Sequence, residues 1–534
     1  MKKMLSMILA GTVILGSLAA CNQPAAPATP AAPPAGQAAA PADSAPTPAA
    51  PTPAAPADDA RDYIIIGTEN EAGTISPGRH GTLAGSFMNA MTHNGLFRQH
   101  YSTLDIVPDL VDTYRAISDS VWEFTLRQGV QFHNGDTMTA HDVAASLEYL
   151  RSYPYAMAFQ GSVVGWEVVD DHTIRLNTGE PNALLFVDLT NHGNFVLPQS
   201  LIDSGHDFTA VPIGTGPYRF EEWRSGDFLR FSAFEDYFDT ARAPQIQDVT
   251  WRIIPEGASR TIALEVGDIH YIVEVSAPDA ARLQAHPDIY VHLGMSTQHN
   301  HLLLNNELPK FANIHVRRAL DMAIDKEAVV IVGMDGLAEP IWNQVPINFA
   351  GVSFENENRF DPEGARALLA EHNIDPATLS FDLIASNDAR RRMAEVIQAN
   401  MADIGIDVTI VQTDFATFFQ VTTDGEYDTA IANFTSASLL TYMFAMLHRD
   451  NIGGLNRNRI DHPELSALID QSITTVDETA RLAVIGEATA IANYHTGMVP
   501  LFQAFIARAF STDLIVPETG GAGELHINMM SWRQ

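Results

Sequence analysis

The chain of 534 residues has very little cysteine and very little lysine. Cys21 is its only cysteine, which excludes an internal disulfide and leaves the hydrophobic core to hold the fold together. Beyond Lys2 and Lys3, the only lysines are Lys310 and Lys326, and the formal net charge is −34. No basic patch emerges along the sequence, which argues against nucleic acid as a partner. A charge of this size favours solubility, and it disfavours anionic ligands at long range unless local arginines override it.

Long apolar runs are also missing, apart from one at the N-terminus. Residues 4–15 are apolar and follow two lysines, but the run is too short to span a bilayer and has the form of a signal peptide. The next residues, Leu-Ala-Ala-Cys, resemble a bacterial lipobox, which predicts a lipoprotein signal peptide over residues 1–20 and acylation of Cys21. The alternative is an incidental cysteine at an ordinary cleavage site. Residues 24–57 are almost entirely alanine and proline, so we interpret residues 21–60 as the lipidated cysteine and a tether.

Catalytic motifs are absent from the sequence. It contains no Gly-x-Ser-x-Gly elbow, no His-Glu-x-x-His helix and no cysteine-based metal cluster, so it predicts neither an enzyme nor a bound metal. His299 and His301 stand two residues apart, a spacing that places both imidazoles on one face of a strand. A metal site needs a third ligand and none is evident, so a solvated or hydrogen-bonded pair is the more frequent outcome.

The clearest local pattern lies within residues 107–150. Apolar and polar residues alternate over residues 121–127, which predicts a strand with one buried face. Residues 134–136, Asn-Gly-Asp, predict a tight turn, because glycine accepts the positive φ that such a turn requires. Thr139 and Asp142 then form the pattern of a capping box, which predicts that a helix begins there.

A glycine-rich segment at residues 212–220 predicts a different local structure. Gly214, Gly216 and the proline after them predict a sharp bend before a strand that starts at Tyr218. A phosphate loop is excluded, because no Gly-Lys-Ser or Gly-Lys-Thr follows and no helix begins here. Other predicted elements are strands at 63–68, 408–411, 427–431 and 528–532, a hairpin at 166–176, and helices at 386–404, 463–472 and 478–494.

These stretches resemble the family 5 extracellular solute-binding proteins, which are the large ligand receptors of peptide, nickel and related ABC importers. Similar blocks lie at residues 107–150, 212–220, 263–269 and 315–326, in the expected order, within a resemblance that covers residues 62–532. It implies an α/β fold with two lobes, of periplasmic-binding-protein type II (cluster C), with an extra subdomain in lobe I. It also implies that a solute is captured between the lobes by hinge closure.

The same resemblance implies where each lobe lies along the chain. Strands near Tyr271 and Phe502 are expected to cross between the lobes and to act as the hinge. The expected limits are lobe I at 61–98, 184–275 and 505–534, an accessory subdomain at 99–183, and lobe II at 276–504.

Candidate ligand contacts are also implied by the resemblance. Ser86 and Phe87 in lobe I match positions where oligopeptide-binding relatives touch the ligand backbone, although a cap or core role is equally frequent for such residues. Tyr155 of the accessory subdomain is expected to face the cleft, where an aromatic ring covers a ligand at little entropic cost. The contacts expected in lobe II are Phe415, Phe434, Thr435, Ser436, Ser438 and Tyr442.

The charged ligand-binding residues of peptide-binding relatives are missing at the matching positions. The loop at residues 433–440 has no aspartate to pair with a peptide amino terminus, and Thr422 and Ile431 replace carboxylate-binding arginines. A buried ligand charge without its partner is costly, commonly by a few kcal/mol. We therefore predict a neutral or weakly charged solute, such as a sugar that stacks on aromatic rings or a blocked peptide.

The functional prediction is an extracytoplasmic receptor that delivers a small solute, peptide-like or other, to the permease and ATPase subunits of an ABC importer. We expect a monomer without a cofactor, held on the cell envelope through the lipid on Cys21. The alternative is a lipid-anchored sensor or chaperone-type protein with the same fold and no dedicated importer. A secreted hydrolase is a more distant alternative.

Overall fold

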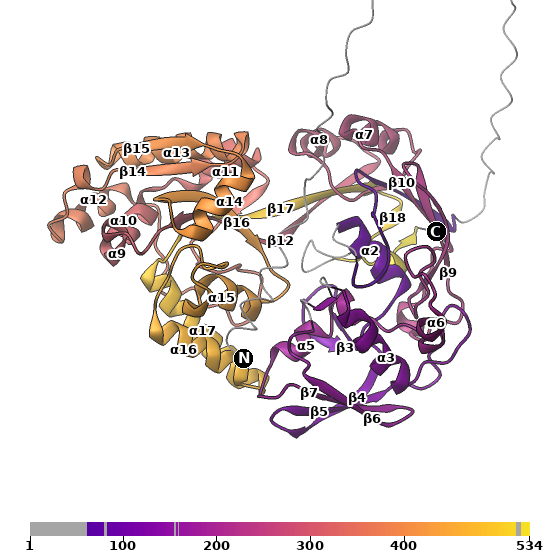
Figure 1. The fold of residues 1–534 in the computed structure, drawn as a ribbon. Coiled ribbons are helices and arrows are strands. Elements are labelled where there is room, and N and C mark those ends of the chain that lie inside the picture. Colours follow the sequence, from indigo (N-terminus) through magenta and orange to yellow (C-terminus); the bar gives the residue numbers. More distant parts are fainter. Residues whose placement is uncertain (1–60, 80–82, 154–155, 158–159, 519–524, 534) are drawn as a thin grey trace, which may run out of the picture.

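The protein has two lobes that lie side by side and are connected by long strands (Figure 1). Lobe I contains the indigo and purple N-terminal elements, and lobe II contains the orange ones. The predicted signal peptide, Cys21 and Tyr155 lie outside the described residues. The residues that this computed structural model describes are 61–79, 83–153, 156–157, 160–518 and 525–533.

One sheet of eleven strands runs through both lobes. Its strands are β1 (Tyr63–Thr68), β8 (Tyr218–Arg224), β9 (Phe228–Ala233), β10 (Asp248–Ile253) and β11 (Tyr271–Ile272) in lobe I, β13 (Ala338–Pro340), β14 (Phe381–Ala385), β15 (Val408–Gln412) and β16 (Thr429–Thr435) in lobe II, and the shared strands β12 (Ile289–Leu304) and β17 (Val499–Ser511). The order is β15-β14-β16-β12-β17-β11-β1-β10-β9-β8, and β13 pairs with β17 off this path.

The two shared strands form the connection between the lobes. β12 and β17 are antiparallel, and Ile289 pairs with Ser511 in lobe I while Leu302 pairs with Val499 in lobe II. The pairing register shifts just after Met295, and such an irregularity bends a strand pair locally. The bend therefore lies where the pair passes from one lobe to the other.

Helices cover the sheet in each lobe. In lobe II they enclose a core that includes Leu320, Leu383 and Ile397. In lobe I a separate core forms around Trp251 and Tyr271. The helices are α2 (Leu83–Thr92), α5 (Leu184–Asp188), α6 (Gln199–Ser204), α7 (Gly257–Glu265) and α8 (Ala277–Leu283) in lobe I, and α9 (Pro309–Ala312), α10 (Ile314–Ala323), α11 (Lys326–Met334), α12 (Pro362–Glu371), α13 (Asp388–Asp403), α14 (Phe415–Asp424), α15 (Leu439–Leu447), α16 (Pro463–Thr474) and α17 (Glu478–His495) in lobe II.

The expected lobe limits stay predictions. Near the limit expected at residue 276, α8 packs into the same hydrophobic cluster as α7 and β11 of lobe I, with Leu264, Ile272 and Leu283 among its members. β12 follows this helix and then passes into lobe II.

A four-stranded sheet in the order β4-β5-β7-β6 forms the accessory part of lobe I. The predicted strand, hairpin and capped helix are all present, and the Thr139 N–H donates to Asp142 Oδ2 at 2.7 Å. Glu123 on the predicted polar face is nevertheless buried, because Arg115 and Arg175 both bind its carboxylate. The elements of this accessory part are β4 (Val111–Ser118), β5 (Val121–Leu126), β6 (Gly165–Asp170), β7 (Thr173–Asn177) and α3 (Ala140–Arg151). The short strand pair β2 (Phe97–Gln99) and β3 (Ile106–Pro108) lies beside them.

The C-terminal end of the chain differs from the prediction. A strand was expected over residues 528–532, but residues 527–529 form a 3₁₀ turn, and the strand, β19 (Ser531–Trp532), is limited to the last two of these residues. β19 pairs with β18 (Leu514–Ile515) outside the large sheet, and Trp532 Nε1 donates to Tyr63 O at 3.0 Å. The segment does return to lobe I.

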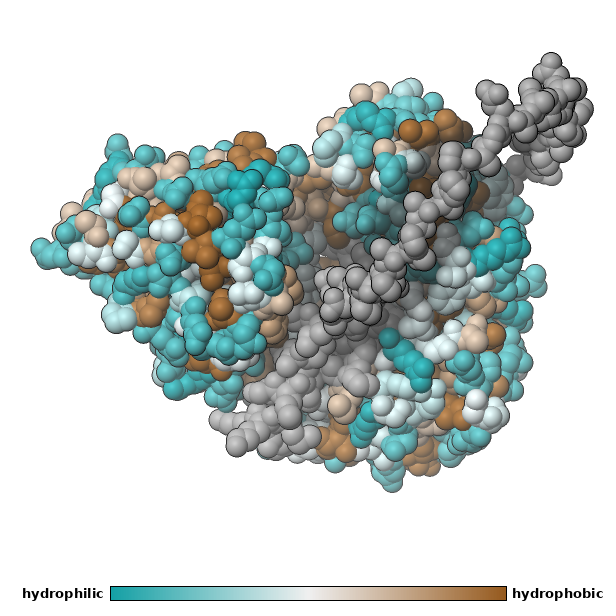
Figure 2. All heavy atoms as spheres, turned by 45° about the horizontal axis from the view of Figure 1, so that its top comes forward, coloured by the Kyte–Doolittle hydropathy of each residue, from teal (hydrophilic) through white to brown (hydrophobic). Residues whose placement is uncertain are grey.

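The surface of the two lobes is largely hydrophilic on the face seen in Figure 2, and hydrophobic side chains gather there only in small patches. Among the helices of the described ranges, none is long and apolar enough to cross a membrane.

Gly214 and Gly216 are required for close packing rather than for a turn. Neither residue has a positive φ, but the Gly216 N–H donates to Thr92 O at 3.0 Å, so this segment lies directly against the end of α2. A Cβ on Gly216 would overlap backbone atoms of Met91 and Thr92. The sequence correctly indicated that glycine is needed in this segment. The physical reason is the close approach of two backbone segments.

Gly216→Ala is expected to destabilise lobe I by roughly 1–3 kcal/mol, because the methyl group meets backbone that cannot rotate away. Urea unfolding followed by circular dichroism measures the change. Gly165→Ala is the matched control, since a Cβ there meets nothing within 4 Å. Equal unfolding midpoints for the two variants would contradict the packing explanation.

Candidate functional site

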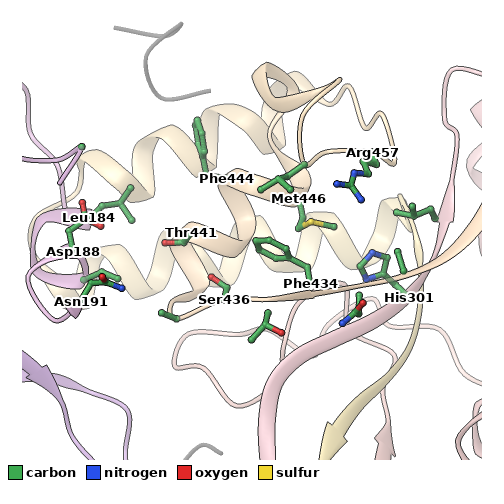
Figure 3. A pocket seen from close by; sticks show the side chains of 18 of the residues that line it. Leu184, Asp188, Asn191, His301, Phe434, Ser436, Thr441, Phe444, Met446 and Arg457 are labelled. Carbon is green, nitrogen blue, oxygen red and sulfur yellow. The ribbon is translucent and has the colours of Figure 1, made fainter. Parts of the chain in front are cut away.

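A cavity of about 430 Å³ lies between the two lobes (Figure 3). Lobe I contributes one wall from residues 161–162 and 182–191, which include α5. Lobe II contributes the other wall from β12, β16, α13, α14, α15 and the segment at residues 455–457. The volume is in the range of sites for small molecules.

The pairing of β16 with β12 positions one side of the lobe II wall. His301 lies opposite Ala432 in this register, so both residues reach the cavity from neighbouring strands. α15 positions another side: Ser438 caps the helix by accepting from the Thr441 N–H at 3.1 Å. Thr441 and Phe444 are three residues apart and therefore share the face that borders the cavity.

Most of the residues predicted in lobe II border this cavity, but two do not. Tyr442 is fully buried behind it, where its ring lies 5.4 Å from that of His299 and 5.8 Å from that of Phe434. Ser438 borders a second interlobe cavity of about 480 Å³. The predicted residues that border the first cavity are Phe415, Phe434, Thr435 and Ser436.

The residues predicted in lobe I lie elsewhere or outside the described residues. Ser86 and Phe87 are in α2, and the buried Phe87 ring stacks on that of Trp251 with centroids 6.0 Å apart. Neither residue is part of the described lining of the cavity. Tyr155 lies in a stretch outside the described residues. Ligand contact by these residues stays a prediction.

Tyr271 and Phe502 lie on either side of the crossing between the lobes. Tyr271 is in β11 of lobe I, pairs with Phe510 of β17, and stacks on its ring at 5.5 Å. Phe502 is in the lobe II half of β17, fully buried, and pairs with Pro340 of β13. Both residues therefore hold the ends of the crossing in their lobes, and their role as a hinge stays a prediction.

Two arginines on the lobe II wall were missed by the sequence interpretation. Arg390 at the start of α13 donates to Asn433 Oδ1 at 2.7 Å and to Ser386 Oγ at 2.5 Å. Arg457 is 8% exposed, and its guanidinium lies 4.1 Å from the centroid of the Phe419 ring. Burial lowers the pKa of Arg390, and burial followed by the charge of Arg390 lowers the pKa of Arg457 to about 10. No local sequence pattern marks them, because only the tertiary fold brings these two segments together.

His299 and His301 form a hydrogen-bonded pair that is fully buried, with their Nδ1 atoms 3.1 Å apart. His299 Nε2 lies 3.0 Å from the Asn343 carbonyl oxygen, so this nitrogen carries the proton. Burial and neighbouring positive charges keep the pKa of His301 well below its ordinary value. In the described ranges, no group of three metal-ligating side chains forms.

Asp188 is the acidic residue of the lobe I wall. It ends α5, and burial raises the pKa of its carboxyl to about 7, although hydrogen bonds from Ser162 oppose this. In Figure 3, Asp188 and Asn191 lie at one end of the cavity, and Arg457 and His301 lie at the other. The cavity is therefore polarised from lobe I to lobe II.

The two positions used to predict an uncharged ligand face away from the cavity. Thr422 is fully buried in α14, and its hydroxyl donates to Phe418 O at 2.8 Å. Ile431 packs into the core of lobe II. The missing arginines at these positions therefore say little about the charge of this wall.

Comparisons with known proteins agree with this arrangement of a cavity between two lobes. Residues 105–453 match the family model for bacterial extracellular solute-binding proteins, family 5. The chain is similar to heme-binding protein A of Haemophilus influenzae, with 26% identity over 77% of this chain and 81% of that protein. It is 28% identical to the glutathione-binding protein GsiB of Salmonella typhi over 57% of this chain, a match that spans 60% of GsiB. The structure of HbpA2 from Haemophilus parasuis superposes with a TM-score of 0.82 and 22% identity, over 88% of this chain and 100% of that one.

The fold is therefore that of a two-lobed periplasmic binding protein of type II. The chain belongs to the family 5 bacterial extracellular solute-binding proteins. Proteins of this family bind small solutes or peptides outside the cytoplasm for ABC importers. The predictions of fold class and family are confirmed.

Proposed function

We propose that this protein is a monomeric, lipid-anchored receptor that encloses a small solute between its lobes and delivers it to an ABC permease. The observation that carries the proposal is a cavity whose walls come from both lobes. The cavity lies beside β12 and β17, the two strands that connect the lobes. Bending of β12 and β17 moves one wall away from the other and opens the cavity. The lipobox at Cys21 and the Ala/Pro tether support attachment to the outer side of a membrane. The solute is peptide-like or another small molecule that fits this volume.

The lobes also touch at the rim away from the connecting strands. The Ala183 N–H of lobe I donates to Ile473 O of α16 at 2.7 Å, and Gln99 Nε2 donates to Ala437 O at 2.9 Å. Ala183 and Leu184 of lobe I also pack against the hydrophobic cluster of α15–α17, and Val476 of lobe II packs against the accessory core, so opening by hinge bending separates these apolar contacts as well. The rim contact between residues 183 and 473 therefore gives a direct way to test the motion.

A disulfide across the rim is expected to prevent opening. In a Cys21→Ser background, Ala183→Cys and Ile473→Cys place two thiols beside an existing backbone hydrogen bond, and the chain has no other cysteine. Small-angle X-ray scattering of the oxidised form is expected to give one compact radius of gyration, and reduction is expected to increase it. Ala183→Cys alone is the control. A radius that does not change on reduction, with or without a mixture of solutes, would contradict hinge opening.

A further inference from the structure

The lobe II end of the cavity carries two positive charges without an acidic partner. Among the described residues, no carboxylate forms an ion pair with Arg390 or Arg457. The Arg457 Nε atom is buried without a hydrogen-bond partner, and no described residue accepts from this guanidinium. A buried charge that is left unpaired is destabilising, so this end of the cavity is incomplete as it stands.

Arg317 is a buried arginine whose guanidinium is fully provided with partners. Arg317 is also 8% exposed, but its guanidinium donates to carbonyl oxygens of Phe311, Ala312, His495 and Thr496. These carbonyls lie at the ends of α9 and α17, where such groups need donors. At this position the fold satisfies a buried guanidinium with carbonyl oxygens alone. Arg457 is the contrasting case, and it borders the cavity.

His301 adds a hydrogen-bond acceptor to the same end. Since His299 Nε2 donates to the Asn343 carbonyl, the Nδ1 atom of neutral His299 accepts, and His301 Nδ1 must donate to it. The proton on Nδ1 leaves the Nε2 atom of neutral His301 with a lone pair. This atom has no partner among the described residues.

The rest of the wall indicates what else the solute contains. Aromatic rings of Phe415, Phe418 and Phe434 border the cavity, and so do the polar side chains of Thr435 and Ser436. Asp188 stands at the opposite end, on lobe I (Figure 3). An anionic group is therefore favoured at the arginine end and disfavoured at the Asp188 end, which orients an elongated solute across the cleft.

We propose that the solute is acidic, with an oxyanion (carboxylate or phosphate) held by Arg390 and Arg457, an adjacent N–H or O–H that donates to His301, and an apolar part against the phenyl rings. The inference rests on the proposed function and names the class of its solute. This proposal replaces the neutral solute predicted from the sequence. That prediction compared Thr422 and Ile431 with the arginines of relatives, whereas the arginines of this cleft are Arg390 and Arg457. Guanidinium groups match the planar geometry of such oxyanions.

Competition between acidic solutes and their neutral counterparts tests the proposal. The purified mature protein is incubated with three pairs of solutes, each an acid and an equal amount of its counterpart without the acidic group. The pairs are N-acetylphenylalanine with its amide, glutathione with its diethyl ester, and phenyl phosphate with phenol. After washing, the protein is denatured and the retained molecules are measured by mass spectrometry. At least one acid is expected to be enriched about tenfold or more over its neutral partner. The carboxylate and phosphate pairs distinguish the two kinds of oxyanion.

Variants at the arginine end separate a binding role from a structural one. Arg457→Gln is expected to remove the enrichment, and Arg457→Lys is expected to keep part of it. Arg366→Gln is expected to leave the enrichment unchanged, because Arg366 is exposed on α12 and its guanidinium donates to Asp403 O. The solute-free Arg457→Gln protein is expected to melt no lower than wild type, because the variant removes an unpaired charge.

Equal retention of acids and neutral counterparts by the wild-type protein, or unchanged enrichment in Arg457→Gln, would overturn the proposal. So would a large fall in the melting temperature of the solute-free variant, which would show a structural role. Retention of neutral solutes together with opening of the reduced rim-cysteine protein would leave the receptor function standing and reject only its acidic solute. Failure of the scattering test is therefore distinguishable from failure of this one.

Discussion

Lys326→Met is expected to lower the free energy of unfolding of lobe II by roughly 3–5 kcal/mol, the usual cost of removing one partner from a buried ion pair. Lys326 and Asp321 are 0% and 1% exposed as side chains, and their charged atoms are 2.7 Å apart. Lys326 also donates to Ile341 O and lies 3.6 Å from the centroid of the Trp342 ring. Without the lysine, the hydrogen bond from Asn358 is the one that the buried Asp321 carboxylate keeps from the described part of the chain.

The matched control for this prediction is Arg391→Met. Arg391 pairs with Glu395 on the exposed side of α13, and an exposed pair of this kind contributes about 0–1 kcal/mol. The double variant Lys326→Met with Asp321→Asn is expected to recover part of the loss, because it leaves no unpaired charge. Urea unfolding of the four proteins measures the differences. A loss in Lys326→Met no larger than in the control would show that the buried pair does not stabilise lobe II.

Features that depend on neighbouring residues were predictable from the sequence. The strand β5 follows from its alternation, and the start of α3 follows from Thr139 and Asp142, because both patterns involve residues only a few positions apart. The family follows from several such blocks in order. At the end of the chain the strand predicted over residues 528–532 was only partly right, because residues 527–529 turn and only residues 531–532 form a strand, β19, which pairs with β18.

Features that depend on distant segments were not predictable in this way. Glu123 is buried on a face that alternation marks as polar, because arginines from two neighbouring strands bind it. Tyr442 matches a ligand-contact position but turns into the core behind the cavity. Arg390 and Arg457 belong to separate segments, and they meet because each guanidinium lies over a phenyl ring of α14, that of Phe418 for Arg390 and that of Phe419 for Arg457. The charge of the cleft is therefore a tertiary property.

Asp188 is expected to make stability depend on pH in an unusual direction for a carboxyl group. Its pKa is raised from 3.8 to about 7 in the folded protein, so the folded state keeps this proton in a range where the unfolded chain has lost it. The folded state then binds more protons than the unfolded state between these two values, and stability falls as pH rises through that window. The contribution is largest below pH 4 and is lost above pH 7, with a total of roughly 4 kcal/mol at most.

Asp188→Asn removes this contribution while it keeps a polar side chain of the same shape. The variant is therefore expected to match wild type near pH 4 and to exceed its stability at pH 8 by up to roughly 4 kcal/mol, as measured by urea unfolding of the solute-free proteins. The difference between the two proteins isolates Asp188 from the many other carboxylates of this acidic chain. Asp203→Asn, at an exposed position of α6, is the control for the loss of one carboxyl group. A constant difference between Asp188→Asn and wild type from pH 4 to pH 8 would show that Asp188 ionises normally in the folded cleft.

A stability difference that grows with pH would show that lobe I presents a protonated carboxyl to the cavity in mildly acidic surroundings and a carboxylate above neutrality. The acidic solute proposed here then meets least repulsion from the Asp188 end at low pH.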